Sequence, residues 1–249
     1  MPNTYFQFKQ FRIDQEHCAM KVCTDACILG AWFASKLRDS SIFPLHDQKS
    51  SKRILDLGSG TGLLMMMLAQ ITTASIDGIE IGETCYDQMT KNIRQNNWSD
   101  RLTALNGDAR SYPFRFKYDF IISNPPFYEN DLVSENESRQ VAMHSKLMNL
   151  RDLAQILKKN LSSSGVAGIM LPSHRAKAFE AIAAAEGLYS MEELMVRQTP
   201  GHNYFRTITS YSFEKPAVVT TTELVIKNDD KEYSSKFKQL MAPYYLHLA

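Results

Sequence analysis

The stretch NPPF at residues 124–127 places an amide side chain, two prolines and a phenylalanine directly after a short apolar run. Prolines fix φ and lack an N–H donor, so they predict a rigid corner with unpaired carbonyl oxygens. The side-chain oxygen of Asn124 and the carbonyl of Pro125 could accept both hydrogens of one amino group, and Phe127 could stack on a planar base. A plain Pro-Pro turn explains neither the amide nor the ring. We therefore predict a catalytic corner for a planar amine, formed by Asn124, Pro125, Pro126 and Phe127.

A glycine-rich loop, LDLGSGTG at residues 55–62, is the second group of residues that could bind a ligand. Glycines let a ligand approach the backbone closely, and the N-terminus of a helix is expected to follow them. A GxGxG loop alone is a weak signal, shared by nucleotide-binding enzymes and structural turns. Asp56, just before the first glycine, suits a ligand with a cationic amino-acid portion better than one with a pyrophosphate. The candidate ligand contacts in this loop are Asp56, Gly58, Ser59, Gly60 and Gly62.

Two further carboxylates stand at the expected carboxyl ends of the next two strands. Glu80 lies about twenty residues beyond the loop, where a carboxylate can accept from both hydroxyls of a ribose. Asp108 is placed to accept from an exocyclic amine. Either residue alone could equally be a helix N-cap or part of a solvated turn. Together with the glycine loop and Asn124, they predict a nucleoside with an amino-acid tail, S-adenosylmethionine.

Short apolar strands alternate with longer amphipathic segments from about residue 52 onward, which predicts a parallel sheet covered by helices on both faces. The expected strands are 52–58, 75–81, 102–108, 118–124 and 166–172. The expected helices are 61–72, 83–96, 147–161 and 175–187, with Ser162–Gly165 ending the third and Gly187 the fourth. Two more strands, 191–200 and 204–214, have no helix between them and should pair antiparallel at one edge. The predicted fold class is α/β, with a Rossmann-like, mostly parallel seven-stranded sheet and an antiparallel edge hairpin.

The chain is expected to divide into a core and two additions. Residues 1–50 are interpreted as an N-terminal extension and linker packing on the core, with an aromatic, strand-like start and a helix from about Thr24 to Leu37. The core spans 51–215. Residues 216–249 are expected to form a C-terminal extension of the same domain, with a strand, a turn and a final helical segment.

The composition is that of an ordinary globular protein, with 249 residues, 44% of them hydrophobic, and a formal net charge of +1. A net charge this close to zero does not indicate a polyanionic substrate, although a local basic face remains possible. The N-terminal residues lack an apolar signal segment, and the longest apolar run, 63–69, is too short to span a bilayer, so a cytoplasmic protein is expected. The spacing of Cys18, Cys23, Cys27 and Cys85 does not complete a metal site, so reduced thiols and no metal are expected.

These motifs resemble those of the class I S-adenosylmethionine-dependent methyltransferases, in which NPPF is the signature of enzymes acting on a conjugated amino nitrogen. Residues 8–32, FKQFRIDQEHCAMKVCTDACILGAW, and residues 232–248, EYSSKFKQLMAPYYLHL, look like the two ends of one bacterial family. That family comprises the tRNA adenine-N6 methyltransferases that modify valine tRNA next to the anticodon. Cys23 stands where the family usually has glycine, a departure that could alter a turn. By this resemblance, Lys21, Thr24 and Asp25 would border the cofactor pocket.

The resemblance implies transfer of a methyl group from S-adenosylmethionine to N6 of adenine 37 in tRNA. The expected partner is the anticodon loop of that tRNA, bound by a monomeric chain without a metal and without a membrane. Because the methyl group leaves a sulfonium, the leaving group is neutral and positioning should supply most of the catalysis.

Several alternatives remain open. A ribosomal-RNA guanine-N2 methyltransferase would also use NPPF, whereas protein glutamine N5-methyltransferases usually have tyrosine after the prolines and a different N-terminal domain. A non-catalytic RNA-binding module is opposed by the intact polar residues at the four strand ends. Residues 128–138 could form a mobile lid over the base or a simple disordered loop. Residues 199–206 could contact RNA or form an ordinary hairpin tip.

Overall fold

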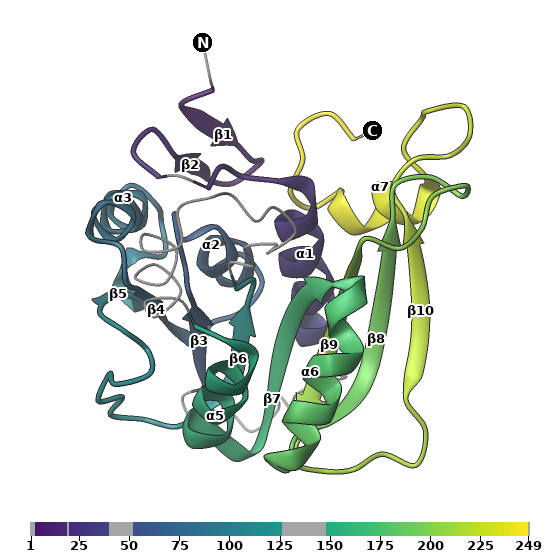
Figure 1. Ribbon diagram of the computed structural model, residues 1–249. Coiled ribbons are helices and arrows are strands. Elements are labelled where there is room, and N and C mark those ends of the chain that lie inside the picture. The colour runs from purple at the N-terminus through teal and green to yellow at the C-terminus, as the bar shows by residue number, and fades with distance from the viewer. Residues whose placement is uncertain (1–2, 19, 40–51, 126–147, 249) are drawn as a thin grey trace, which may run out of the picture.

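The computed structural model describes residues 3–18, 20–39, 52–125 and 148–248 (Figure 1). An eight-stranded mixed sheet forms its centre, in the order β10-β8-β9-β7-β6-β3-β4-β5. Its strands are β3 (Arg53–Leu57), β4 (Ser75–Glu80), β5 (Leu102–Asn106), β6 (Tyr118–Ser123), β7 (Leu161–Pro172), β8 (Tyr189–Arg197), β9 (Arg206–Ser212) and β10 (Thr220–Val225). A separate antiparallel pair near the N-terminus consists of β1 (Tyr5–Gln7) and β2 (Arg12–Asp14).

Five neighbouring strands, β5, β4, β3, β6 and β7, run parallel, so their carboxyl ends share one edge of the sheet. The chain order reverses between β3 and β6, because β4 and β5 extend the sheet on one side of β3 while β6 and β7 extend it on the other. Ligands of open α/β sheets bind at such a switch point, outside the carboxyl ends of the strands. The topology therefore directs attention to the residues that follow β3 and β6.

The α/β class, the parallel centre of the sheet and the antiparallel pairing of β8 with β9 are confirmed. The sheet has one strand more than expected, because β10 pairs in parallel with β8 and covers the edge assigned to the hairpin. The helix ends before Ser162–Gly165, as expected, but the expected start of the next strand at residue 166 is wrong, since β7 begins at Leu161 directly after α5. The register between β6 and β7 shifts between Tyr118 and Phe120, and this irregularity accommodates the longer strand.

Helices cover both faces of the sheet (Figure 1). One buried cluster includes α1 (Thr24–Arg38), α2 (Leu63–Ala69) and α3 (Glu83–Arg94), and the other includes α5 (Leu150–Asn160) and α6 (Ser173–Ala185). A short 3-10 turn (Ser99–Arg101) precedes β5, and α7 (Ser235–Met241) follows β10. The expected helical stretches in the core are therefore found, and Gly187 has a left-handed φ of 84° just after α6, as expected for a cap.

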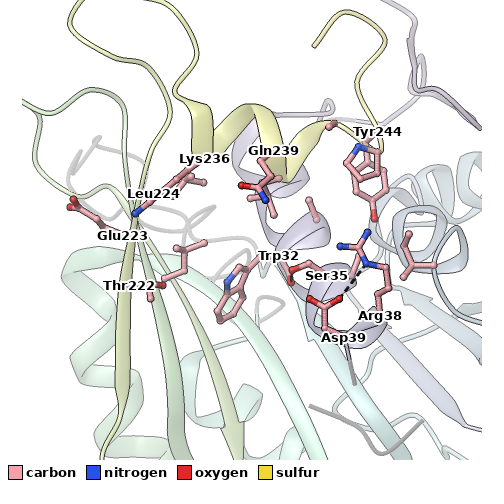
Figure 2. Close-up of a pocket in the computed structure, with 17 residues that line it drawn as sticks. Trp32, Ser35, Arg38, Asp39, Thr222, Glu223, Leu224, Lys236, Gln239 and Tyr244 are labelled. Atoms are coloured by element: carbon pink, nitrogen blue, oxygen red, sulfur yellow. Dashed lines mark hydrogen bonds and ion pairs between the residues drawn. The ribbon is translucent and has the colours of Figure 1, made fainter. Parts of the chain in front are cut away.

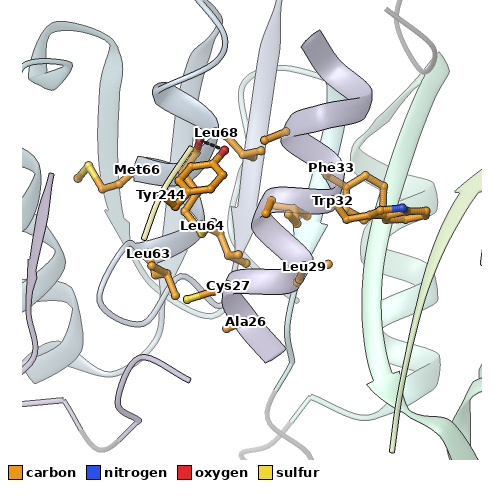
Figure 3. Close-up of a cluster of buried hydrophobic side chains, with 14 of the residues drawn as sticks. Ala26, Cys27, Leu29, Trp32, Phe33, Leu63, Leu64, Met66, Leu68 and Tyr244 are labelled. Carbon is orange, nitrogen blue, oxygen red and sulfur yellow. Dashed lines mark hydrogen bonds between the residues drawn. The ribbon is translucent and has the colours of Figure 1, made fainter. Parts of the chain in front are cut away.

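Helix α1 packs between the sheet and α2 (Figure 3). The ring of Phe33 is fully buried, and its centroid lies 5.0 Å from that of Phe120 on β6. Glycine is required at Gly168 on β7, because a Cβ there would lie 2.3 Å from a ring carbon of Phe33. At the N-terminal end of α1, Asp25 pairs at 2.9 Å with Arg206, which lies opposite the last residue of β7. The start of α1 is thus held at the carboxyl edge of the parallel strands.

The two ends of the described chain meet beside helix α2. The backbone N–H of Lys9 donates to the carbonyl of Tyr244 at 2.8 Å, and its ammonium donates to the carbonyl of Ala242 at 2.7 Å. The hydroxyl of Tyr244 donates to the carbonyl of Met67 on α2 at 3.1 Å. The N-terminal hairpin, α2 and the segment after α7 therefore pack as one unit.

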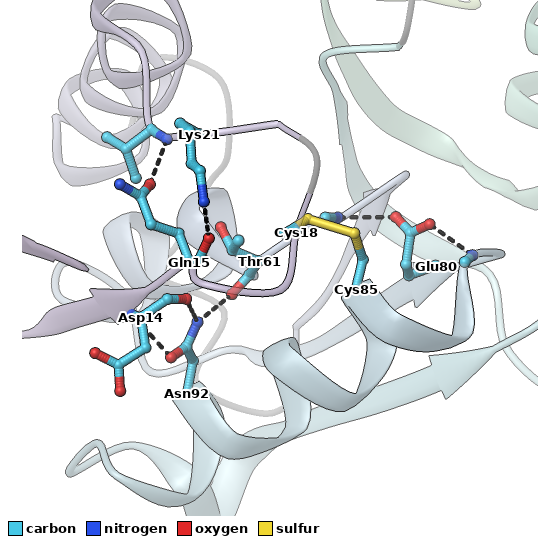
Figure 4. The surroundings of a disulfide bond; sticks show 11 residues. Asp14, Gln15, Cys18, Lys21, Thr61, Glu80, Cys85 and Asn92 are labelled. Carbon is cyan, nitrogen blue, oxygen red and sulfur yellow. Dashed lines mark hydrogen bonds between the residues drawn. A yellow bond between two sulfur atoms is a disulfide. The ribbon is translucent and has the colours of Figure 1, made fainter. Parts of the chain in front are cut away.

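A disulfide joins Cys18 to Cys85 near the start of α3 (Figure 4). Cys23 and Cys27 are free thiols, so the expectation of reduced cysteines is wrong for the first pair only. Cys18 and Cys85 are 67 residues apart in sequence, and spacing alone gave no reason to pair them. The bond fastens the segment after β2 to the helix that follows β4.

Candidate active site

The glycine loop turns from β3 into α2 through three left-handed glycines, with φ of 76° at Gly58, 54° at Gly60 and 83° at Gly62. Residues with a Cβ rarely adopt this conformation, which explains the residue type. A Cβ built on Gly58 or Gly60 would meet no described atom within 4 Å, so the loop faces open space. The backbone N–H groups of Gly58 and Ser59 both donate to the carbonyl of Ile79 on β4, each at 3.0 Å. The loop is therefore fixed to the neighbouring strand and open on the ligand side.

Asp56 lies beneath this loop and is fully buried. Neither carboxylate oxygen has a hydrogen-bond partner among the described residues. Burial raises the pKa of Asp56 to about 7 and the charge of Glu80 adds to the rise, while the nearby Ser59 side chain and the Met65 backbone oppose it. Neither opposing group makes a hydrogen bond of normal geometry to the carboxylate, since the Ser59 hydroxyl donates to the backbone carbonyl of Asp56 at 2.8 Å. A buried carboxylate without a partner is costly, so such a group is typical of a site that binds a polar or cationic ligand.

Glu80 ends β4 and holds the glycine loop with its carboxylate (Figure 4). One oxygen accepts from the N–H of Gly60 at 2.9 Å and the other from the N–H of Gly82 at 2.8 Å. Each carboxylate oxygen can accept more than one hydrogen bond, so capacity for two further donors remains. Glu80 thus orders the loop, and its role toward the hydroxyls of a ribose remains a prediction.

Asp108 follows β5 and is paired with Arg110, a contact that sequence reasoning missed. The guanidinium Nε of Arg110 lies 3.0 Å from both oxygens of Asp108, and Nη2 lies 2.6 Å from one of them. This hydrogen bonding lowers the pKa of Asp108. The spacing Asp-x-Arg could have suggested the pair. An amine bound to Asp108 would have to share the carboxylate with Arg110.

The NPPF corner begins beside the glycine loop. Leu57 and Ser123 are the last paired residues of β3 and β6, and the hydroxyl of Ser123 donates to the carbonyl of Leu57 at 2.7 Å. Gly58 and Asn124 follow these two residues directly, Asn124 half-buried and Pro125 buried. The corner and the loop therefore meet at the switch point of the sheet. The predictions for Pro126, Phe127 and the lid at 128–138 lie outside the described residues.

The N-terminal residues assigned to the pocket have partners within the protein. Lys21 donates through its ammonium to the carbonyl of Gln15, and Thr24 is the first residue of α1. Asp25 accepts from its neighbour Ala26 at 3.0 Å with one oxygen and from Arg206 with the other. These contacts order the entry to α1, and the roles of Lys21, Thr24 and Asp25 toward a cofactor remain predictions.

The tip between β8 and β9 also has internal partners. The hydroxyl of Tyr204 donates to Glu223 at 2.7 Å, and Arg197 pairs with the same carboxylate at 3.0 Å. His202 Nδ1 and the hydroxyl of Thr199 are 2.7 Å apart. These contacts match the description of an ordinary hairpin tip, the plainer of the two interpretations of residues 199–206.

A cavity of about 500 Å³ lies elsewhere, between α1, β10 and α7 (Figure 2). Trp32, Arg38, Glu223 and Lys236 are among its lining residues, and it includes no residue predicted for the cofactor or the catalytic corner. The candidate site is therefore defined by the switch point of the sheet and not by the size of a cavity. Within the described ranges, no group of three His, Cys, Asp or Glu side chains could hold a metal ion. No described helix is long and apolar enough to cross a membrane.

Comparison with solved structures supports the fold. A predicted O-methyltransferase from Agrobacterium tumefaciens superimposes with a TM-score of 0.61, covering 88% of this chain and 95% of that one at 15% identity. A glycopeptide N-methyltransferase complexed with sinefungin superimposes with a TM-score of 0.53, covering 76% and 87% at 10% identity. At these identities the likeness concerns the fold alone.

Sequence comparison goes further. Residues 37–149 match the model of the methyltransferase small domain. A protein of Christiangramia forsetii is 36% identical over 254 residues, with all of both chains covered, and one of Bacteroides fragilis is 34% identical over 251 residues, again with full coverage. A third, from Dyadobacter fermentans, is 33% identical over 98% of each chain. All three are named tRNA1(Val) (adenine(37)-N6)-methyltransferase. At this identity over nearly the whole length, the chain belongs to the family of tRNA1(Val) (adenine(37)-N6)-methyltransferases.

Proposed function

We propose that this protein transfers a methyl group from S-adenosylmethionine to N6 of adenine 37 in valine tRNA, as a monomer in the cytoplasm. The observation that carries the proposal is the meeting of two features at one switch point of the sheet. The open glycine loop covers the partnerless carboxylate of Asp56, and Asn124 begins a proline corner directly beside it. A cationic ligand and a planar amine would therefore be bound next to each other.

The residues present fit the cofactor. Asp56 has two unsatisfied buried oxygens suited to the ammonium of an amino acid, and the space above Gly58 and Gly60 is open. Glu80 keeps acceptor capacity for the ribose hydroxyls, and Asp108 would accept from the adenine amine beside Arg110. When bound, S-adenosylmethionine supplies an electrophilic methyl group on a sulfonium.

The corner residues would hold the substrate nitrogen. An exocyclic amine is a poor nucleophile because its lone pair is delocalised into the ring. The side-chain oxygen of Asn124 and the carbonyl oxygen of Pro125 would each accept one N–H of that amine and fix the nitrogen in line with the methyl group. Because positioning can supply a large share of a rate enhancement, this arrangement requires no strong general base. As the new N–C bond forms and the S–C bond breaks, the neutral thioether would leave and the nitrogen would become cationic, so that it would lose its proton readily to water.

The direct test uses S-adenosylmethionine labelled in its methyl group and separate pools of unmodified tRNA, ribosomal RNA and protein. We expect the label in tRNA, as N6-methyladenosine after nucleoside digestion. Label in ribosomal RNA as a methylguanosine, or in a protein glutamine, would contradict the substrate and keep the chemistry of the corner. Binding of the cofactor without any transfer would favour a non-catalytic RNA-binding role.

Substitution of Asn124 tests the corner itself. Asn124→Ala should lower kcat by about a hundredfold or more, because the nitrogen loses one of its two fixed acceptors. Cofactor affinity, measured by calorimetry, should change little, since Asp56 and Glu80 remain. A variant with nearly normal turnover would exclude Asn124 from the mechanism.

A further inference from the structure

One face of helix α3 contacts both the glycine loop and the N-terminal segment. Cys85, Met89 and Asn92 recur at steps of four and three residues, which places them on the same side of a helix. Cys85 is bonded to Cys18, and Met89 packs against Gly62, where an added Cβ would lie 3.2 Å from its Cγ. Asn92 completes this row at its C-terminal end. α3 therefore contacts both segments that flank the predicted pocket.

Asn92 is fully buried and uses its whole amide on two backbone segments (Figure 4). Its oxygen accepts from the N–H of Asp14 at 3.0 Å, and its nitrogen donates to the carbonyl of Asp14 at 2.9 Å. The same nitrogen donates to the carbonyl of Thr61 at 2.9 Å. Asp14 ends β2, and Thr61 lies inside the glycine loop. One side chain thus joins the N-terminal hairpin to the loop that would bind the cofactor.

The glycine loop is held from two sides by this arrangement. Glu80 accepts from the N–H of Gly60, and Asn92 donates to the carbonyl of Thr61, the next residue. The peptide groups that precede the left-handed Gly60 and Gly62 are consequently fixed in orientation. A loop of this kind has many alternative conformations without such contacts, because glycine restricts the backbone so little. Removal of either contact should therefore loosen the surface that faces the ligand.

The contact at Asp14 also orders the turn that leads to α1. Gln15 follows Asp14 and is almost fully buried. Its side-chain oxygen accepts from the N–H of Val22 at 2.7 Å, and its backbone carbonyl accepts from the ammonium of Lys21. Gln15 is thus bonded to both Lys21 and Val22, and it directly follows Asp14, the residue whose backbone is bonded to Asn92. α1 begins two residues after Val22, at Thr24.

We propose that Asn92 is a positioning residue for cofactor binding, acting through the backbone of Thr61 and of Asp14. It touches neither substrate nor cofactor in this proposal. Its amide fixes the position of the glycine loop, at Thr61, relative to the N-terminal hairpin, at Asp14. This inference rests on the proposed binding of S-adenosylmethionine and not on the identity of the methyl acceptor.

The test compares Asn92→Ala with Asn160→Ala. Asn160 is a matched control, since it is also a buried asparagine on a helix, where it donates to the carbonyl of Ile156 on α5 at 2.8 Å. Both variants should lose thermal stability. Only Asn92→Ala should weaken the binding of S-adenosylmethionine measured by calorimetry, by about tenfold or more, as expected for lost hydrogen bonds at a ligand loop. In turnover assays its KM for the cofactor should rise while kcat at saturation stays within about threefold of the parent.

A second variant keeps the test decisive if Asn92→Ala does not fold. Asn92→Asp retains the acceptor for the N–H of Asp14 and the side-chain volume, and it removes the donor to the carbonyls of Asp14 and Thr61, so it should show the same rise in KM. Unchanged cofactor affinity in a folded Asn92 variant would overturn the inference. Weakened cofactor binding in a protein that methylates an acceptor other than tRNA would leave the inference standing and contradict only the proposed substrate. A parent protein that binds no S-adenosylmethionine would overturn both.

Discussion

The protonation of one buried side chain, the carboxylate of Asp56, affects the stability of the whole chain. Its carboxylate is buried beneath the glycine loop and has no partner among the described residues, so the folded protein favours its neutral form. A ligand that carries an ammonium group would stabilise the charged form instead. The residue thus makes the cofactor-free protein less stable near neutral pH and prepares it for a cationic ligand.

The pH dependence of stability follows from this environment. The pKa of Asp56 is 3.8 in an unperturbed chain and about 7 in the folded protein. Between these values the folded state holds a proton that the unfolded chain has lost, so the free energy of unfolding should fall as the pH rises from about 4 to about 7. Asp56→Asn should remove this contribution and raise the stability of the cofactor-free protein at about pH 8 by about 1–3 kcal/mol.

Calorimetric unfolding of both proteins across this pH range is the measurement. The parent should also bind S-adenosylmethionine more tightly as the pH rises toward about 7, with release of a proton, and Asp56→Asn should bind weakly at every pH. Identical pH profiles of unfolding for parent and variant would contradict the buried, partnerless state of Asp56.

Residue types and spacing were sufficient to predict which strand ends carry the candidate site. All four candidate residues lie at the carboxyl ends of parallel strands, as the alternation of strands and helices implied: Asp56 is the penultimate residue of β3, Glu80 ends β4, and Asp108 and Asn124 follow β5 and β6. The contacts among side chains and backbone were not predictable. Asn92 reaches a carbonyl 31 residues away and a backbone group 78 residues away, and no periodicity encodes such a pairing.

At the scale of elements, the prediction of regular strands and helices succeeded where the hydrophobic period was long and clear. The strand expected after Pro216 is found as β10, but its place in the sheet was not predicted, since a short strand rich in threonine gives little indication of which partner it joins. The prediction failed at the start of β7, where Ser162–Gly165 resemble a loop but continue the strand that pairs with β6. Pairing in the sheet overrode the local preference of these small residues.

The disulfide between the N-terminal segment and α3 gives a prediction at this scale. It closes a loop of 67 residues, for which chain entropy predicts about 4 kcal/mol of stabilisation. Cys18→Ser, or treatment of the parent with a reductant, should therefore lower the free energy of unfolding in urea by up to about that amount. Reductant should have no additional effect on the Cys18→Ser variant.

Cys23→Ser is the matched control, because Cys23 is a free thiol in the same segment. Burial raises the pKa of Cys23 to about 12, so its thiol stays protonated and should not exchange with the disulfide. Alkylation of the unfolded, unreduced parent followed by mass spectrometry should label Cys23 and Cys27 only. Labelling of all four cysteines before reduction would show that the bond is absent.

At the scale of the whole molecule, the N-terminal hairpin and the segment after α7 stabilise each other. Tyr244, in the segment after α7, is buried and its hydroxyl donates to α2, while its carbonyl accepts from Lys9. The ring centroid of the next residue, Tyr245, lies 5.7 Å from that of Phe6 on β1. The hairpin β1–β2 therefore depends on residues from the far end of the sequence.

Tyr244→Ala should lower the free energy of unfolding by about 3–5 kcal/mol, the usual cost of removing a buried aromatic ring. The ring fixes the segment after α7 on α2, so its loss should also free the backbone carbonyl that accepts from Lys9. Hydrogen exchange, measured by mass spectrometry, should therefore accelerate at residues 5–14. Tyr211→Ala is the control, since Tyr211 is equally buried in the other core cluster and should destabilise the protein without selectively exposing the hairpin. Equal protection of residues 5–14 in the two variants would contradict the dependence.

The contact between Lys9 and Ala242, which are 233 residues apart, also bears on how the chain folds during translation. At about 5–20 residues per second, the ribosome needs on the order of 10 to 50 seconds to synthesise the intervening chain. Phe8, fully buried in the finished protein, lacks its C-terminal neighbour Tyr245 during that interval, whereas Phe11 can already contact Trp98. The nascent chain therefore presents part of a hydrophobic hairpin that chaperones can bind, and the packing around its front end is completed only after nearly all of the protein has been made.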